Sequence, residues 1–250
     1  MKVRLDKLLV ERGLVASRER AQALILAGRV LVDEHKVEKS GAAVEAEATI
    51  RILGEMPRYV GRGGLKLERA LEHWKIDVSG RTCMDVGAST GGFTDCFLQH
   101  GAAQVIAVDT GFGQIDAKLR ADARVHLLER TNARHLTRDQ VEEAAQGGIL
   151  PSAAAMDVSF ISATLVLPAV IAVLKGSEIE PRQLVVLVKP QFEVGRERVG
   201  KGGIVRDEAA QQSSIEKVRQ SLLELGGRKL DAIDSPILGA EGRLYEQERA

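Results

Sequence analysis

Three charged residues stand where a side chain could do chemistry. Asp157 and Lys189 each end a short apolar run typical of a buried strand, and Lys66 lies in a glycine-rich basic stretch. Open α/β sheets bind ligands at the carboxyl ends of their strands. A lysine amine can take a hydroxyl proton when a second ammonium lowers its pKa and a carboxylate holds the geometry. The three residues together predict activation of a hydroxyl group. For each one alone, the alternative is a charge that points into water.

The segment 85–93 predicts a loop that binds a cofactor through its backbone. Residues 82–86 are apolar and β-branched, as in a buried strand, and residues 93–98 are apolar at helical spacing. Small residues between them allow a ligand to touch bare backbone, and the helix offers unpaired N–H groups. The alternative is an ordinary tight turn. The loop residues that could contact a cofactor are Gly87, Ser89, Gly91 and Gly92.

Asp109 strengthens the cofactor interpretation because it ends the next predicted strand, 104–108. A carboxylate at that strand end can accept hydrogen bonds from both hydroxyls of a ribose. A nicotinamide-binding loop requires glycine at its third position, where this chain has Ser89. The glycine loop and the acidic strand end therefore indicate S-adenosylmethionine. The alternative for Asp109 is a solvated aspartate.

From about residue 80 the chain alternates strand and helix, which predicts a doubly wound parallel sheet. A long helix is expected over 209–225, and two final strands are expected at 229–233 and after Gly239. The fold class is therefore α/β, a Rossmann-like sheet preceded by a small α+β domain. The five earlier strands are expected at 82–86, 104–108, 125–128, 153–158 and 184–189.

The first 56 residues predict a separate small domain. Leu5, Leu8 and Leu9 form a helical stripe that stops at Gly13, and Ser17 can cap a second helix that ends at Gly28. A hairpin from Val30 and a strand over 49–53 follow. We therefore expect domain 1–56, a linker at 57–64, and a second domain at 65–250.

Residues 1–29 hold seven basic side chains against three acidic ones, although the whole chain has no net charge. The domain resembles the RNA-binding domain first known from ribosomal protein S-four. The matching residues are Arg4-Leu5-Asp6, Ser17-Arg18, Ala21, Gly28 and Val30-Leu31-Val32. No aromatic residue precedes Tyr59, so base stacking is excluded there and phosphate contacts must dominate. The alternative is an ordinary helix pair with solvated arginines. The expected RNA-binding residues are Arg4, Lys7, Arg18, Arg20, Arg29 and Arg58.

Composition excludes several classes of protein. Cys83 and Cys96 lie in a predicted strand and helix, so they are expected to be core residues, with no disulfide framework and no metal site. The N-terminal residues lack an apolar signal region, and the longest apolar stretch, 163–174, is too short to span a bilayer. These features predict a cytoplasmic protein that does not bind membranes.

Other chemistries lack their characteristic residues. Amine methylation normally uses an Asn/Asp-Pro-Pro-aromatic run, whereas Val158 and Ser159 follow Asp157 here. Base-carbon methylation needs a nucleophilic cysteine, and none follows Cys96. The loop 195–202 ends in Gly202 where a phosphate-binding loop would need Ser or Thr, which excludes nucleotide hydrolysis.

Five segments together resemble the TlyA (hemolysin A-like) family, and the resemblance covers essentially the whole chain. It implies an FtsJ-like domain that methylates the ribose 2′-hydroxyl of cytidine in ribosomal RNA, with catalytic residues at Lys66, Asp157 and Lys189. It also implies that Asp85, Phe93 and Asn132 belong to the cofactor site. The matching segments are 58–67, 85–93, 129–133, 156–162 and 188–195.

The fourth catalytic residue departs from the family pattern. The family's final strand carries a glutamate at the position of Tyr245, and Glu246 is one residue later. Because a slip of one residue turns a strand side chain to the opposite face, Glu246 can serve only if a bulge restores its direction.

The family contains a shorter form that acts on large-subunit RNA and a longer form that acts on both subunits. This chain starts at the RNA-binding motif, which favours the shorter form. One rival hypothesis is a ribosome-assembly factor that keeps the cofactor fold without catalysis. A pore-forming activity, which the family's older name implies, conflicts with the absence of a spanning segment. The expected partners are ribosomal RNA or ribosomal subunits, and the sequence leaves the oligomeric state open.

Overall fold

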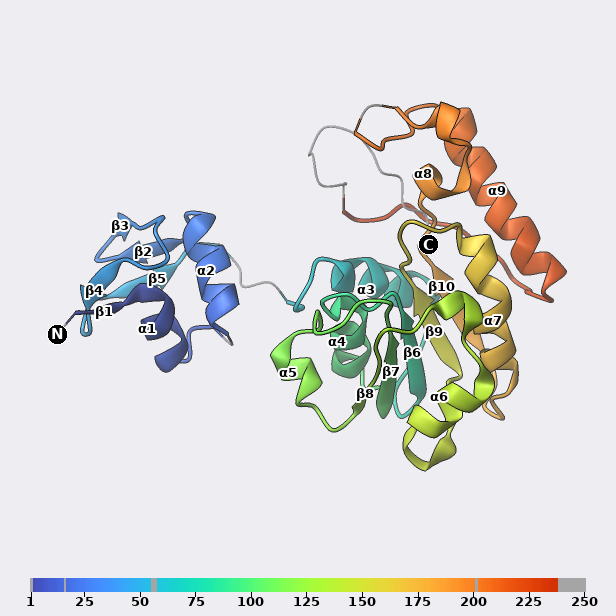
Figure 1. Cartoon of the computed structure of the whole chain (residues 1–250), viewed down its shortest axis with the longest axis horizontal. Helices are drawn as coiled ribbons and strands as arrows, with labels where there is room; N and C mark the ends of the chain where they lie inside the picture. The colour runs from blue at the N-terminus through green and yellow to red at the C-terminus, as the bar shows by residue number, and fades with distance from the viewer. Residues whose placement is uncertain (1, 16, 55–57, 201, 238–250) are drawn as a thin grey trace. The chain divides into compact units, whose positions relative to one another are not determined.

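The computed structural model describes residues 2–15, 17–54, 58–200 and 202–237. It divides the chain into two compact units, Met1–Pro57 and Arg58–Ala250, each with its own buried core (Figure 1). None of the helices in these described ranges is both long enough and apolar enough to cross a bilayer.

Unit 1 combines two short helices with two small antiparallel sheets. Ser17 caps the second helix, since its Oγ accepts a hydrogen bond from the Arg20 N–H at 3.3 Å. Gly28 follows this helix at φ +64°, a conformation that favours glycine. The predicted helices and hairpin are confirmed, but the pair β1–β4 is not predicted by the sequence pattern. The elements are β1 (Lys2–Arg4), α1 (Leu5–Glu11), α2 (Arg18–Leu26), β2 (Val30–Val32), β3 (His35–Lys36), β4 (Ala43–Glu45) and β5 (Ile50–Ile52).

The core of unit 1 lies between the apolar faces of α1 and α2 and the strands. Leu5 and Leu9 of α1, Ile25 of α2 and Val30 of β2 are fully buried. Burying such a side chain contributes roughly 1.5–3 kcal/mol, so the helical stripe read from the sequence is the face that stabilises the unit.

Unit 2 is built on a five-stranded parallel sheet of order β10-β9-β6-β7-β8. β6 is central, and the chain moves outward first through β7 and β8 and then through β9 and β10. This reversal puts the switch point of the sheet between β6 and β9, where open α/β sheets bind ligands. The strands are β6 (Thr82–Val86), β7 (Gln104–Val108), β8 (Val125–Leu128), β9 (Ala153–Met156) and β10 (Gln183–Val186).

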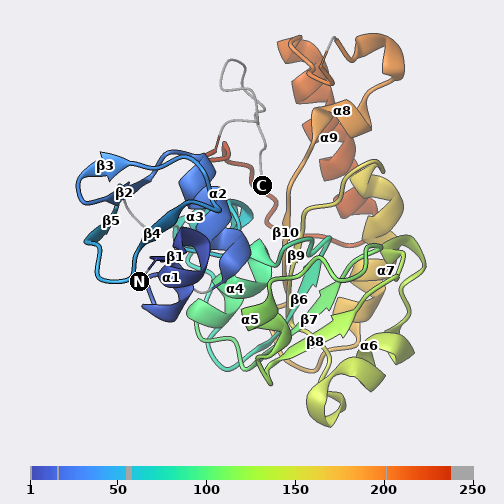
Figure 2. The same cartoon turned by 60° about the vertical axis from the view of Figure 1, so that its left-hand side comes forward.

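Helices cover both faces of this sheet (Figures 1 and 2). One face packs against α3 and α4, with Phe97 and both cysteines buried there. The other packs against α6, α7 and α9, with Leu167 and Val170 buried. The predicted Rossmann-like fold is confirmed. The helices are α3 (Gly63–Trp74), α4 (Gly92–Gln99), α5 (Ala117–Arg120), α6 (Arg138–Ala144), α7 (Ala163–Lys175), α8 (Pro190–Glu193) and α9 (Glu208–Glu224).

The strand expected at 229–233 is wrong. Lys229 has φ +56°, outside the extended region, and Asp231 accepts a hydrogen bond from the Trp74 indole of α3 at 3.0 Å. The side chain of Asp231 therefore ties this segment to a helix. The expected strand after Gly239 lies outside the described residues.

Candidate functional site

Gly87 brings the glycine loop into contact with the end of β9. It follows β6 at φ +89°, and a Cβ at this position would lie 2.5 Å from the backbone oxygen of Asp157. Only glycine permits this approach. The loop that was expected to hold the cofactor therefore adjoins the residue expected to take part in catalysis.

The rest of the loop divides between exposed and packed residues. Ser89 and Thr90 are exposed. In contrast, a Cβ at Gly91 would lie 2.3 Å from the Leu119 side chain, so this glycine is needed for packing of the loop. Phe93 is buried in the apolar core, which leaves its backbone as the part that could meet a ligand.

Asp109 joins the glycine loop to the loop after β7. Its Oδ2 accepts a hydrogen bond from the Ser89 N–H at 2.7 Å, and its Oδ1 accepts one from the Gly111 N–H at 2.6 Å. The carboxylate lines a cavity with acidic and apolar walls, which suits the hydroxyls and the base of a nucleoside. The lining residues are Ala88, Ser89, Ala107, Asp109, Gly111, Gln114, Ile115, Leu127 and Glu129.

Glu129 is a cavity residue that sequence reasoning missed as a site residue. It directly follows β8, as Asp109 directly follows β7, so the same strand-end rule could have found it. Its Oε1 accepts a hydrogen bond from Gly113 N–H at 2.8 Å, and the Arg120 guanidinium lowers its pKa. Asn132, which was expected at the cofactor site, instead caps a short 3₁₀ turn through the Arg134 N–H and is not among the cavity residues.

Asp85 is a fully buried carboxyl group behind the glycine loop. Its Oδ2 accepts hydrogen bonds from the Thr94 N–H at 2.8 Å and from the Thr94 hydroxyl at 2.7 Å. Its Oδ1 has no hydrogen-bond partner within the part of the chain that the structure describes. Burial raises the pKa of Asp85 to about 7, against the two hydrogen bonds from Thr94 that lower it.

The three charged residues singled out by the sequence converge in space. Lys189 forms an ion pair with Asp157, and the Lys66 Nζ lies 3.9 Å from the other carboxylate oxygen. The Lys189 Nζ also donates a hydrogen bond to the Ser159 hydroxyl at 2.8 Å. The side chains are between 13% and 21% exposed, so they are reachable but poorly solvated. Two lysine side chains thus share one carboxylate at the carboxyl edge of the sheet.

Different elements supply these charges. Lys66 comes from the first turns of α3, Asp157 follows β9 directly, and Lys189 immediately precedes α8. β9 and β10 end before these residues, earlier than the sequence pattern predicts. The side chains of Asp157 and Lys189 therefore stand on the short segments that follow β9 and β10.

Glu193 fixes those segments together and was missed by sequence reasoning. Its side chain is 1% exposed, and its carboxylate accepts hydrogen bonds from the Ser162 hydroxyl at 2.5 Å and the Ala163 N–H at 2.6 Å. Lys217 of α9 lies 3.3 Å from Glu193 Oε2. One carboxylate therefore joins the N-terminus of α7, the end of α8, and α9. Ser162 lies shortly after Asp157 in the sequence, and Glu193 lies shortly after Lys189.

Phe160 is a third residue that sequence reasoning did not assign to the site. It is 92% exposed, has φ +66°, and its ring centroid lies 5.5 Å from that of Phe192. A bulky residue in the left-handed region is uncommon and indicates a local constraint. The loop after Asp157 thus presents an aromatic ring to solvent.

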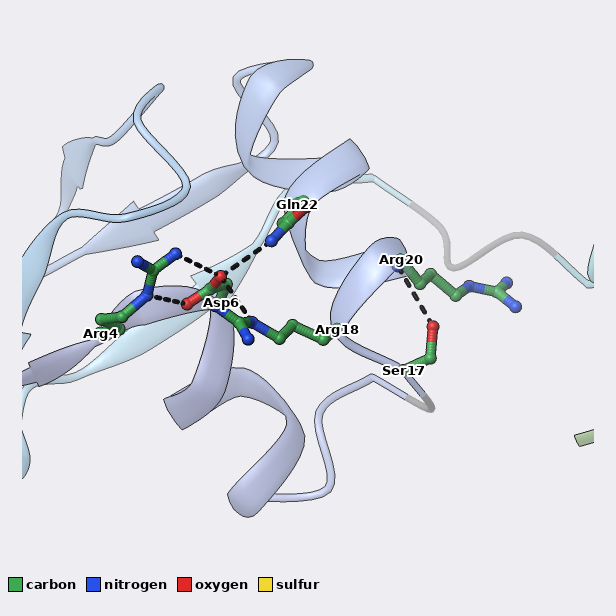
Figure 3. A network of polar contacts seen from close by, with 6 residues as sticks. All are labelled: Arg4, Asp6, Ser17, Arg18, Arg20 and Gln22. Atoms are coloured by element: carbon green, nitrogen blue, oxygen red, sulfur yellow. Dashed lines mark hydrogen bonds and ion pairs between the residues drawn. The ribbon is translucent and has the colours of Figure 1, made fainter. Parts of the chain in front are cut away.

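The expected RNA-binding residues differ in their surroundings. Arg4 and Arg18 both bind the buried carboxylate of Asp6 (Figure 3). Lys7 is exposed, and the Arg20 side chain extends away from that carboxylate (Figure 3). In separate contacts, Arg29 Nε donates a hydrogen bond to the Leu53 carbonyl at 2.8 Å, and Arg58 forms an ion pair with Glu68 in unit 2. Glu246 lies outside the described residues.

Comparisons with known proteins agree with this geometry. The FtsJ-like methyltransferase model matches residues 59–245, and the S4 domain model matches residues 3–50. The 16S/23S rRNA (cytidine-2′-O)-methyltransferase TlyA of Mycobacterium tuberculosis is 43% identical over 97% of this chain and 87% of its own length. The rRNA methyltransferase candidate YqxC of Bacillus subtilis is 43% identical over 97% and 83%, respectively.

A solved structure extends the similarity to the fold. A hemolysin candidate from Streptococcus thermophilus has a TM-score of 0.70 and 41% identity, covering 95% of this chain and 84% of that one. The matches span both units, and they bear out the resemblance read from the sequence. The chain belongs to the FtsJ-like methyltransferases that carry an S4 domain, the family of TlyA.

Proposed function

We propose that this chain transfers a methyl group from S-adenosylmethionine to the ribose 2′-hydroxyl of a cytidine in ribosomal RNA, with the large subunit as a substrate. The observation that carries the proposal is the contact between the glycine loop and the charged cluster. Gly87 meets the backbone of Asp157, so a cofactor on the loop and an acceptor at Lys189 would be neighbours. Reacting groups held this way gain much of their rate from proximity.

The cavity beside Asp109 suits the adenosine part of the cofactor. Asp109 and Glu129 offer carboxylate oxygens to ribose hydroxyls, while Ile115 and Leu127 offer apolar contact to the base. The cofactor supplies an electrophilic methyl group when bound. The buried Asp85 carboxyl lies behind the loop, where a cationic ligand would favour its ionised form.

The charged cluster suits the acceptor hydroxyl. In the proposed step the hydroxyl oxygen forms a bond to the methyl carbon while the carbon–sulfur bond breaks, and the hydroxyl proton passes to the neutral Lys189 amine. Asp157 orients that amine and compensates its charge after proton transfer, and Lys66 contributes a second positive charge. Phe160 is exposed and lies shortly after Asp157 in the sequence. Its ring is suited to stack against a base of the substrate.

Unit 1 would bring the RNA to the enzyme. Its match to the S4 domain and its exposed basic side chains, such as Lys7, support binding through phosphates. The name of the relative in Mycobacterium tuberculosis gives both 16S and 23S ribosomal RNA. For this chain the large subunit is proposed as the substrate, and the small subunit serves as the comparison in the test.

The test is methyl transfer in vitro. Purified protein, radiolabelled S-adenosylmethionine and separated ribosomal subunits from a strain that lacks the corresponding gene should yield labelled large-subunit RNA. Nuclease digestion and mass spectrometry should then identify 2′-O-methylcytidine. Cofactor binding without label in RNA from either subunit would identify a non-catalytic factor, and label on a base would refute the proposed acceptor.

A further inference from the structure

Asp6 is a buried acid in a unit whose proposed partner is a polyanion. It lies in the first turn of α1 (Figure 3). Its side chain is 0% exposed. An unpaired buried carboxylate would be strongly destabilising, so it must be compensated by nearby positive charge and hydrogen-bond donors. The structure supplies both.

Three side chains donate hydrogen bonds to this one carboxylate. Arg4 donates from Nε to Oδ1 at 3.0 Å and from Nη2 to Oδ2 at 2.9 Å. Arg18 Nε and Gln22 Nε2 each donate to Oδ2 at 2.9 Å. These bonds, chiefly the two from Arg4, hold the pKa of Asp6 far below its usual range, so the group is ionised at neutral pH.

The two guanidinium groups are consequently held close together. Arg4 Nη2 and Arg18 Nε each lie 2.9 Å from the same oxygen, so they can be no further apart than twice that distance. The Arg4 side chain comes from the end of β1 and the Arg18 side chain from the first residue of α2, and they are 46% and 45% exposed. Two half-exposed cations thus share one fully buried anion, and the trio keeps a net positive charge.

This arrangement has two opposite consequences for phosphate binding. The negative charge of Asp6 lowers the local positive potential, which weakens attraction of a phosphate. On the other hand, it fixes two long side chains whose rotamer freedom would otherwise be lost on binding, at a cost of up to about 2 kcal/mol for each. Arg4 uses Nε and Nη2 to bind Asp6, and Arg18 uses Nε. Because a guanidinium is planar, the remaining N–H groups of each arginine are then held in a fixed plane.

We propose that Asp6 is a positioning residue that holds Arg4 and Arg18 as a preformed two-guanidinium site for one phosphate group of RNA. The exposure of both side chains favours this role, because a purely structural ion pair would not need a second half-exposed cation. The inference rests on the proposed RNA-binding function of unit 1.

The sign of one mutational effect separates the two consequences. Asp6→Asn removes a negative charge, so simple electrostatics predicts tighter RNA binding. Loss of positioning predicts the reverse, and we expect affinity to fall by about fivefold or more because the arginines lose their anchor. The measurement is fluorescence anisotropy of the full-length chain with deproteinised, labelled ribosomal RNA at a fixed salt concentration.

Glu11→Gln is the matched control, because it removes the same charge from an exposed residue of α1. It should leave the affinity unchanged or slightly raise it. Tighter or equal binding by Asp6→Asn would overturn the inference. Wild-type protein that does not bind RNA at all would instead refute the proposed function of unit 1, and the inference with it.

A second variant decides the matter if Asp6→Asn does not fold, as circular dichroism would show. Arg18→Lys keeps the positive charge beside Asp6 but replaces the planar fork by a single ammonium. We expect it to fold and to bind RNA about threefold or more weakly. The matched control is Arg51→Lys, the same substitution at an exposed arginine of β5 that pairs with Glu34, and it should bind as well as wild type. Wild-type affinity of Arg18→Lys would overturn the inference.

Discussion

Replacing Asp85 by asparagine removes a buried titrating group while keeping the size of the side chain. The asparagine oxygen can still accept the hydrogen bonds that Asp85 Oδ2 accepts from Thr94. The variant therefore isolates the cost of ionising this position. Burial raises the pKa of Asp85 from its ordinary value of 3.8 to about 7, because a charged carboxylate is poorly solvated there.

The direction of the effect follows from proton binding. Between about pH 4 and pH 7 the unfolded chain loses this proton while the folded chain keeps it, so folding stability falls as pH rises. The stability that the protonated Asp85 contributes is complete below about pH 4 and is lost once the pH has passed about 7. Each pH unit corresponds to 1.36 kcal/mol, which gives about 2–3 kcal/mol between pH 5 and pH 7.

The assay is urea unfolding followed by the fluorescence of Trp74. It is the chain's single tryptophan and lies in α3, so it reports on unit 2. Relative to wild type, the Asp85→Asn variant should gain about 2–3 kcal/mol in free energy of unfolding between pH 5 and pH 7. A constant difference between the two proteins over this range would show that Asp85 does not titrate there, and the account of its burial would be wrong.

Three further substitutions test the site. Asp109→Ala should weaken S-adenosylmethionine binding about tenfold or more in calorimetry, because it removes a charged hydrogen bond. The control Asp77→Ala, at the opposite end of the sheet, should bind the cofactor as well as wild type. Equal affinities of the two variants would remove Asp109 from the site. Gly87→Ala should cost at least about 2 kcal/mol of stability by urea unfolding, since its Cβ would meet the Asp157 backbone, whereas Gly80→Ala at a similar φ has open space and should cost about half as much. Equal costs would argue against the close approach. Glu193→Gln should lower kcat for methyl transfer roughly tenfold with cofactor affinity unchanged, because its Lys217 ion pair is lost; an unchanged kcat would make it a stability residue only.

The main features of unit 2 could be predicted because they follow from local patterns. Alternating strands and helices define the sheet, and the strand-end rule selects Asp157, Lys189 and Asp109 from the sequence alone. Lys66 lies in a helix, so its place beside Asp157 depends on how α3 packs. Its glycine-rich basic surroundings make Lys66 a candidate, and the family resemblance implies its catalytic role. The strand pattern alone gives no reason to place it beside Asp157.

Other features depend on contacts that a linear pattern does not encode. Asp6 shows no sign in the sequence of being buried, because its partners Arg4 and Arg18 come from two other elements. Phe93 could have faced a ligand or the core, and the rotation of α4 decides for the core. The segment 229–233 has strand-like composition, but a tertiary contact to α3 overrides that preference.

The central claim is that the charged cluster of unit 2 activates a ribose hydroxyl, with Lys189 as the residue that takes the proton. The most direct measurement is single-turnover methyl transfer to the large subunit by wild type, Lys189→Ala and Lys189→Arg, each shown to bind cofactor and RNA normally. Both variants should lose on the order of 10²–10⁴ in the rate of methyl transfer, because alanine offers no base and a guanidinium keeps its proton. A Lys189→Arg variant that forms 2′-O-methylcytidine at near the wild-type rate would contradict the central claim.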